Sequence, residues 1–318
     1  MEDIFKTENN LGILNDRYLL IELICDSSSS AEIYKVLDKN TGQIRVAKIF
    51  YENNTKEFED ENKILKSFDN KIPGVIAFFD SGEGLLYLKD KEIEAKRKYI
   101  ILELAKRSVL DYRVEVDKFS EETYKYIFYQ YILIIKELHK RGISHRDIKL
   151  ENMLFTGDDY TLKFCDLGLS ASFLDDSNKK KKLEGIKGSP HHCAPEILEN
   201  KEYDGEKIDI FSAGATLFSL IKKEFAFLDA RINDNIYRLI YNKYYKSFWR
   251  KVDEKNIFSP ELKDLIVKML AYKPDKRITL DEILDSDYLK VFKKEGKLEE
   301  YKNKMIKELN AITFEKNE

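Results

Sequence analysis

The sequence predicts an α+β protein with two lobes, a small β-rich lobe followed by a larger helical one. Two observations support this class. The first hundred residues hold short runs of β-branched and aromatic residues with one amphipathic segment, whereas from about Ser120 apolar residues recur at spacings of three and four. The chain has 318 residues, of which 43% are hydrophobic, enough for one large domain or two lobes sharing a cleft. We place the lobe boundary near Ala105.

In the first lobe, β-branched and aromatic runs predict strands over residues 17–23, 32–37, 43–50 and 99–104. The polar segment 38–42 between two of these runs suits a hairpin turn. Segment 57–68 is predicted to be a helix with one buried face, because its apolar residues follow helical spacing. These residues are Phe58, Ile64, Leu65 and Phe68.

In the second lobe, a long helix is expected after Ser120, where six apolar residues recur at helical spacing. They are Tyr124, Phe128, Tyr131, Ile132, Ile135 and Leu138. Further helices are expected near residues 208–221, 260–270 and 280–284. The C-terminal tail carries another stripe, formed by Leu298, Tyr301, Met305, Leu309 and Ile312. This stripe predicts a helix that either docks on its own lobe or binds a regulatory partner.

Composition excludes several classes of function. The balance of 55 basic against 58 acidic residues argues against nucleic acid or an anionic membrane as the main partner. The most apolar stretch, 126–135, is too short and too polar to span a bilayer. Met1-Glu2-Asp3 begins no signal peptide, and Glu2 excludes N-myristoylation. Three widely spaced cysteines suit a reducing compartment, so we expect a cytoplasmic protein, with the nucleus left open.

Three motifs follow one another in the second lobe: HRDIKLEN at 145–152, DLG at 166–168 and APE at 194–196. Their order and spacing resemble the eukaryotic protein kinase family, in which they form the catalytic loop, the magnesium-binding triplet and the end of the activation segment. The resemblance implies the two-lobed kinase fold. It places an N-terminal extension at 1–16, a small lobe at 17–104, a helical lobe at 105–292 and a helical tail at 293–318.

The resemblance implies a role for each polar residue of these motifs. Phosphoryl transfer depends mainly on positioning and charge neutralisation. Asp147 is expected to accept the proton of the substrate hydroxyl, and Lys149 to neutralise charge on the transferred group. Asn152 and Asp166 supply the oxygen ligands that Mg²⁺ prefers. Lys149 is typical of the serine/threonine branch, so we expect transfer from ATP to a serine or threonine of a protein substrate.

The resemblance also assigns residues of the first lobe to the nucleotide. Lys48, in the run RVAK, matches the strand lysine that reaches the α- and β-phosphates, and Val46 is expected to pack against adenine. Glu61 is the best match for the helix carboxylate that pairs with Lys48. Glu57 and Glu59 remain alternatives for that role.

The segment between the lobes is expected to bind adenine through its backbone. Glu103 and Ala105 occupy the positions whose main chain would hydrogen-bond the base, which makes Leu102 the residue that limits access to the pocket. Leu154 is expected to form the floor beneath the base.

The phosphate-covering loop departs from the family pattern. Counting back from Lys48, Ile33 takes the place of the usual valine, while Asp26, Ser28 and Ala31 take the places of three glycines. Glycine is used there because a backbone without Cβ can approach phosphate oxygens closely. The substitutions predict weaker binding of ATP. They also support an alternative function, a pseudokinase that serves as a binding or scaffolding module.

The activation segment contains the run GSPHHC at 188–193, which is similar to calcium/calmodulin-dependent and AMP-activated-type kinases. Gly185 stands where such relatives carry a phosphorylatable threonine. We therefore expect Glu184 to offer its carboxylate to Arg146 in place of a phosphate.

Two further residues are expected to be structural. Asp209 resembles the buried helix aspartate that anchors the catalytic loop, and Arg277 resembles the arginine that pairs with Glu196.

Overall fold

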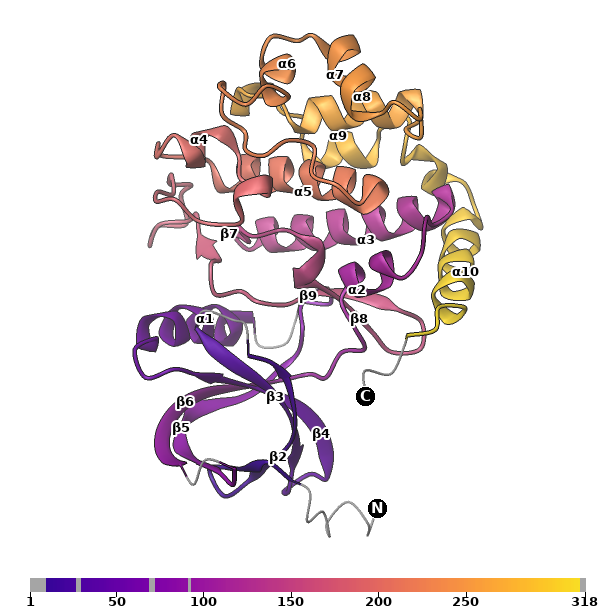
Figure 1. Cartoon of the computed structure of the whole chain (residues 1–318). Coiled ribbons are helices and arrows are strands. Elements are labelled where there is room, and N and C mark those ends of the chain that lie inside the picture. The colour runs from indigo at the N-terminus through magenta and orange to yellow at the C-terminus, as the bar shows by residue number, and fades with distance from the viewer. Residues whose placement is uncertain (1–9, 27–29, 69–71, 91–92, 315–318) are drawn as a thin grey trace. The chain divides into compact units, whose positions relative to one another are not determined.

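The computed structural model describes residues 10–26, 30–68, 72–90 and 93–314, which form two compact units that divide after Ala105 (Figure 1). The first unit is rich in strands and the second is mainly helical. The predicted α+β class, with a small β-rich lobe and a larger helical lobe, is confirmed.

The first unit is a closed antiparallel barrel with strand order β1-β2-β3-β4-β6-β5 (Figure 1). Its strands are β1 (Gly12–Leu14), β2 (Tyr18–Cys25), β3 (Ala31–Asp38), β4 (Gln43–Phe50), β5 (Phe78–Leu88) and β6 (Ile93–Leu102). The sequence reading missed β1, which is only three residues long, and β5, whose residues 80–84 are polar or glycine. Because β1 pairs with both β2 and β5, the fold of the first unit begins before Arg17, where the kinase domain was predicted to start.

Apolar side chains on alternate strand positions fill the barrel, among them Leu14, Tyr18, Leu20, Tyr34, Val36, Ala47, Ile49, Leu86, Tyr99 and Ile101. The predicted hairpin joins β3 to β4. The Asp38 carboxylate accepts hydrogen bonds from the Asn40 amide at 3.0 Å and the Thr41 hydroxyl at 3.0 Å, and it also binds the Arg17 guanidinium at 2.8 Å. Gly42 closes the turn in the left-handed region, at φ 68°.

Helix α1 (Thr55–Phe68) buries Phe58, Glu61, Leu65 and Phe68. The predicted face is therefore correct except at Ile64, which is half-buried. A carboxylate lies on the buried face of this helix, and such a group requires a partner.

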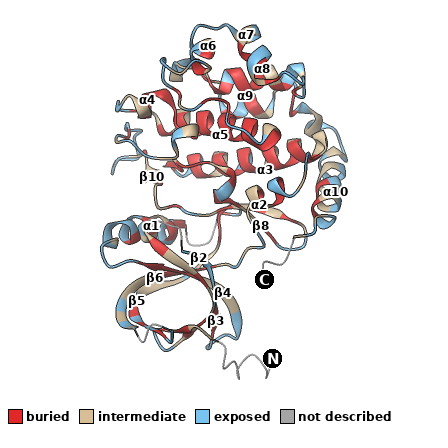
Figure 2. Ribbon diagram, in the orientation of Figure 1, coloured by how far each residue is buried: buried red, intermediate tan, exposed pale blue. Residues whose placement is uncertain are grey.

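Two helices form the core of the second unit: α3 (Glu121–Lys140) and α5 (Gly205–Lys222). Figure 2 shows buried residues along both of them, and α5 is buried over most of its surface. Each begins at a side-chain cap. The Ser120 hydroxyl accepts from the Thr123 amide at 3.3 Å, and the Asp204 carboxylate accepts from the Glu206 amide at 2.9 Å.

The remaining elements of this unit surround that pair. The helices are α2 (Val109–Val114), α4 (Pro195–Leu198), α6 (Tyr237–Tyr241), α7 (Tyr245–Val252), α8 (Pro260–Met269), α9 (Leu280–Leu284) and α10 (Lys297–Asn310). The strands β7 (Ile143–Ser144) and β10 (Ala171–Ser172) form one antiparallel pair, and β8 (Met153–Thr156) and β9 (Thr161–Phe164) form another. Short 3₁₀ turns lie at Leu150–Asn152, Pro190–His192, Pro274–Lys276 and Lys290–Lys293.

The C-terminal helix α10 packs against α3 (Figure 1). Met305 and Leu309 are its buried residues, so two members of the predicted stripe make the main contact. Glu308 accepts a hydrogen bond from the Ser120 amide at 3.1 Å, and the Asn310 side chain accepts one from the Tyr160 hydroxyl at 2.7 Å. The tail thus takes the first of its two predicted forms, a helix docked on its own lobe.

Within the described ranges, no helix combines the length and the apolar character needed to cross a bilayer.

Candidate active site

The predicted site residues fall into two groups, one in each unit. In the first unit, Lys48 Nζ lies 2.7 Å from Glu61 Oε2, and both side chains are buried. The rival carboxylates, Glu57 and Glu59, are exposed, and Glu59 lies 3.3 Å from Lys98. Among the three candidates, the structure therefore pairs Glu61 with Lys48.

Strand register places the other candidates of this unit beside Lys48. Ile33 on β3 is the register partner of Lys48, and Val46 on β4 is the register partner of Leu102. Because successive side chains of a strand alternate between faces, these four residues share one face of the sheet. Ala47, which lies between Val46 and Lys48, belongs to the barrel core on the opposite face.

The three positions that replace glycines differ in environment. Ala31 is fully buried and is the first residue of β3, where it pairs with Phe50. Asp26 is exposed, and its carbonyl oxygen accepts a hydrogen bond of 3.4 Å from the Tyr51 hydroxyl. Ser28 lies outside the described residues. Ala31 is therefore part of a strand, whereas Asp26 follows the last residue of β2.

The predicted adenine-binding positions lie at the end of β6 and just beyond it. The Glu103 amide donates to the Ala77 carbonyl at 2.9 Å, and the Ala77 amide donates to the Glu103 carboxylate at 3.1 Å. Ala105, the last residue of the first unit, is half-buried. Leu154 lies in the second unit on β8, half-buried, where it pairs with Lys163.

In the second unit, the Asp147 carboxylate is the centre of a compact polar network. Its Oδ1 accepts from the Ser189 amide at 2.9 Å and from the Ser189 hydroxyl at 2.8 Å. Its Oδ2 accepts from the Asn152 side chain at 3.0 Å and lies 2.9 Å from Lys149 Nζ. Lys149 also donates to the Ser189 hydroxyl at 3.0 Å. Three side chains from two loops, those of Lys149, Asn152 and Ser189, thus hold one buried carboxylate in a single orientation.

The charges of this network support one another. Burial on its own would raise the pKa of Asp147, but the hydrogen bond and charge of Lys149, with further donation from Ser189, leave that pKa below its usual value. The pKa of Lys149 is raised, because its contacts with Asp147 outweigh the effect of burial. Both groups are therefore charged at neutral pH.

Asp209 on α5 fixes the backbone that leads into this network. Its fully buried carboxylate accepts from the His145 amide at 2.9 Å, the Arg146 amide at 2.9 Å and the His139 ring at 2.8 Å. These donors offset burial and lower its pKa. Arg146 itself has φ 65°, a conformation that non-glycine residues adopt at a cost. The predicted structural anchor thus holds a strained residue immediately before Asp147.

The two predicted magnesium ligands lie at one end of the β8–β9 hairpin. The Cys165 amide, next to Asp166, donates to the Asn152 carbonyl at 3.0 Å. The Asn152 side-chain nitrogen donates to both the carbonyl and the carboxylate of Asp147, so its Oδ1 is the atom left for a cation. Asp166 is exposed, with φ 54°.

This donor set fits Mg²⁺. The described ranges contain no cluster of three or more His, Cys, Asp or Glu side chains that could by itself hold a metal ion. Magnesium is usually bound by one or two protein oxygens, with substrate phosphates and water completing its shell. Two oxygen ligands from Asn152 and Asp166 match that pattern.

Sequence reasoning missed two residues of this region, Ser189 and Tyr203. Ser189 follows Gly188, where φ is 97° and a Cβ would lie 2.5 Å from the Arg146 carbonyl, so this close approach requires glycine. The Gly-Ser pair before the APE motif was therefore a signal for the contact with Asp147. Tyr203 had no such signal, because its contacts join distant segments.

The predicted ion pair between Glu184 and Arg146 is wrong for the described residues. Glu184 is exposed, and the Arg146 side chain instead donates to the Leu169 carbonyl and to the Tyr203 hydroxyl. The other predicted structural pair is present: Arg277 donates to both carboxylate oxygens of Glu196, at 2.6 and 2.7 Å, and both side chains are buried.

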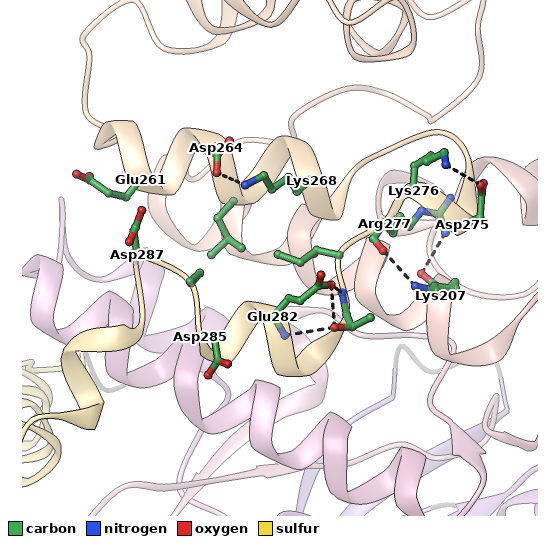
Figure 3. A pocket seen from close by; sticks show the side chains of 14 residues that line it. Lys207, Glu261, Asp264, Lys268, Asp275, Lys276, Arg277, Glu282, Asp285 and Asp287 are labelled. Atoms are coloured by element: carbon green, nitrogen blue, oxygen red, sulfur yellow. Dashed lines mark hydrogen bonds and ion pairs between the residues drawn. The ribbon is translucent and has the colours of Figure 1, made fainter.

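A cavity of about 700 Å³ lies elsewhere in the second unit, between α8 and α9 (Figure 3). None of the predicted site residues lines it. Its wall carries both signs of charge, and several of these groups are paired with each other, such as Asp264 with Lys268 at 2.5 Å. We assign it no ligand.

Comparison with known proteins agrees with this geometry. The sequence profile of the protein kinase domain matches residues 27–289. CBL-interacting serine/threonine-protein kinase 14 of Arabidopsis thaliana is 30% identical over 292 residues, which cover 90% of this chain and 61% of that protein. CBL-interacting serine/threonine-protein kinase 10 of Arabidopsis thaliana is 34% identical, over 68% of this chain and 43% of that protein. CBL-interacting protein kinase 26 of Oryza sativa subsp. japonica is 36% identical, over 63% of this chain and 38% of that protein.

The chain thus spans about half the length of these curated relatives. The motifs, the two-unit architecture and the profile match all lead to the same assignment: the chain belongs to the eukaryotic protein kinase family, in its serine/threonine branch.

Proposed function

We propose that the chain is an active protein serine/threonine kinase that transfers the γ-phosphoryl group of ATP to a serine or threonine hydroxyl. The observation that carries this proposal is the network around Asp147. A buried carboxylate with a lowered pKa, held by Lys149, Asn152 and Ser189, is ionised and oriented at neutral pH. Such a group can accept or orient the proton of an attacking hydroxyl.

Each remaining residue has a defined task in this proposal. Lys149, which is charged and already beside Asp147, stabilises negative charge on the transferred group. Asn152 and Asp166 would hold Mg²⁺. Lys48, held in place by its ion pair with Glu61, would hold nucleotide phosphates. When bound, ATP supplies the phosphoryl group and Mg²⁺ neutralises its charge.

Adenine contacts are assigned to backbone and apolar groups. The main chain of Glu103 and Ala105 would hydrogen-bond the base, while Val46 and Leu154 would pack against it. Ile33, on the same sheet face as Lys48, would cover the nucleotide from β3.

The scaffolding alternative rested on the loop from Asp26 to Ala31. It gains no support from the polar networks, since Lys48, Asp147 and Lys149 are all held in the ion pairs that the proposed chemistry uses. The names of the relatives state CBL interaction for those proteins. We extend phosphoryl transfer, but not that interaction, to this chain, and we retain a cytoplasmic location as part of the proposal.

The direct test is transfer of labelled phosphate. Purified protein would be incubated with labelled ATP, Mg²⁺ and a generic basic protein, alongside the Asp166→Ala variant, followed by phosphoamino-acid analysis. Label on serine or threonine with the wild-type protein alone supports the proposal. No label with the wild-type protein, while that protein binds ATP, contradicts the proposal and favours a scaffold.

A further inference from the structure

Arg146 joins the catalytic loop to the activation segment through neutral oxygen atoms. Its Nε donates to the carbonyl of Leu169, just after the DLG triplet, and its Nη1 lies 3.3 Å from the Tyr203 hydroxyl. No carboxylate forms an ion pair with this guanidinium among the residues that the structure describes. The arginine next to Asp147 is thus oriented without a negatively charged partner.

Tyr203 is the second half of this connection. Its side chain is 1% exposed, and its hydroxyl lies 3.0 Å from the Glu184 carbonyl and 3.1 Å from the Gly185 carbonyl, to which it donates. A phenol hydroxyl carries one proton and can also accept, so it can receive the Arg146 N–H while donating to this backbone. The hydroxyl therefore bridges the arginine and the activation segment.

The backbone of Tyr203 holds the same segment from another direction. The Leu183 amide donates to the Tyr203 carbonyl at 2.9 Å, and the Tyr203 amide donates to the Leu183 carbonyl at 2.8 Å. Residues 183–185 are therefore bound by two backbone bonds and one side chain. The last residue of this run, Gly185, has φ 86°, a conformation that favours glycine. Its carbonyl accepts a hydrogen bond from the Tyr203 hydroxyl.

We propose that Tyr203 is a positioning residue for phosphoryl transfer: its hydroxyl keeps the activation segment attached to Arg146 and so maintains the active arrangement without a phosphate. This inference rests on the proposed kinase activity. Tyr203 acts through Arg146, whose backbone Asp209 anchors beside Asp147. The Glu184 carboxylate takes no part in this connection between Tyr203 and Arg146.

The test removes only the hydroxyl. Tyr203→Phe would be compared with Tyr237→Phe, a matched control, since Tyr237 is also fully buried and its hydroxyl also donates to a backbone carbonyl, that of Leu270 at 3.2 Å. Loss of one hydrogen bond to a charged group should lower kcat about ten-fold in Tyr203→Phe. The KM for ATP should stay within about two-fold, because no nucleotide-binding residue is changed. Tyr237→Phe and Glu184→Gln should keep the wild-type kcat, and so should phosphatase-treated wild-type protein.

A second measurement does not depend on activity. The exposed lysines at 179–182 and Lys187 lie on either side of the bridged segment and are sites for trypsin. Limited proteolysis, with fragments identified by mass, should cut these sites faster in Tyr203→Phe than in wild type or Tyr237→Phe. If the wild-type protein transfers no phosphate, the proposed function fails, yet this comparison still decides whether the hydroxyl holds the segment.

Three results would overturn the inference. One is a Tyr203→Phe variant whose kcat and rate of tryptic cleavage equal those of Tyr237→Phe. Another is a Glu184→Gln variant with a lower kcat, which would restore the carboxylate as the partner of Arg146. The third is loss of activity on phosphatase treatment.

Discussion

The catalytic loop at 145–152 and the segment 26–31 are both assigned to the nucleotide and its transferred group, but they are built in different ways. In the catalytic loop, side chains such as Asp147 and Asn152 are buried and bonded to each other. In the other segment, Asp26 is exposed and Ala31 is the buried first residue of strand β3. Chemistry that depends on side chains requires particular residues, whereas contacts made by the backbone allow the residue types to change.

The largest expected effect tests the catalytic half of this comparison. Asp147→Ala and Asp166→Ala should each lower kcat about a thousand-fold or more, since one removes the proton acceptor and the other a metal ligand. Steady-state kinetics would measure the loss. Asp166→Ala should also lose Mg²⁺-dependent nucleotide binding, which Asp147→Ala should keep. Wild-type turnover in both variants would show that the assigned roles are wrong.

The next effect concerns the support beneath the loop. Asp209→Ala leaves the buried amides of His145 and Arg146 without their acceptor, so the free energy of unfolding should fall by about 3 kcal/mol. Urea denaturation would measure it. Asp158→Ala is a suitable control, because that carboxylate is exposed and its ion pair with Lys106 lies on the surface. Equal losses in the two variants would contradict the anchoring role.

A smaller effect is expected in the segment 26–31. Replacing Asp26 and Ser28 by glycine should lower the KM for ATP about five-fold, because a negative charge and two Cβ atoms no longer oppose the phosphates. Initial rates over a range of ATP concentrations, at saturating Mg²⁺, would show it. Ala31→Gly alone should leave this KM unchanged and reduce stability instead, by about 0.5–1 kcal/mol, since the residue lies in a strand. A lower KM for Ala31→Gly would place its backbone at the phosphates.

The smallest effect is a pH dependence. The folded protein lowers the pKa of Asp209 below 3.8, its ordinary value, so the protein gains stability from this group at any pH above that value. The gain is lost as the pH falls below 3.8 and through the lower pKa of the folded state. Between pH 7 and pH 5 the difference in unfolding free energy between wild type and Asp209→Asn should stay constant. Below pH 3.8 this difference in unfolding free energy should shrink. A difference that already changed at pH 6 would show that another group titrates.

Site residues whose contacts lie close to them in the sequence were predictable. The motif HRDIKLEN placed Asp147, Lys149 and Asn152, because each contacts the others within one short loop. Glu61 was a better candidate than its rivals on pattern, and burial on α1 distinguishes it from them.

Contacts between distant segments were not predictable. Tyr203 contacts Arg146, which lies 57 positions earlier in the sequence, and no local sequence pattern predicts such a bond. Glu184 was chosen for its charge, although the structure needs only a neutral oxygen at that place. Strand β5 was missed because its residues 80–84 are polar or glycine, and neighbouring strands rather than propensity make this run extended.

The three residues of β1 have a consequence for how other chains can bind the first unit. By pairing with residues 18–20 of β2 on one side and residues 86–88 of β5 on the other, they close the ring and cover the edges of those two strands over three residues each. An open sheet edge accepts an added strand from a partner or from another copy, which serves recognition but also permits aggregation. A short N-terminal segment thus keeps these stretches of β2 and β5 from accepting a strand of another chain.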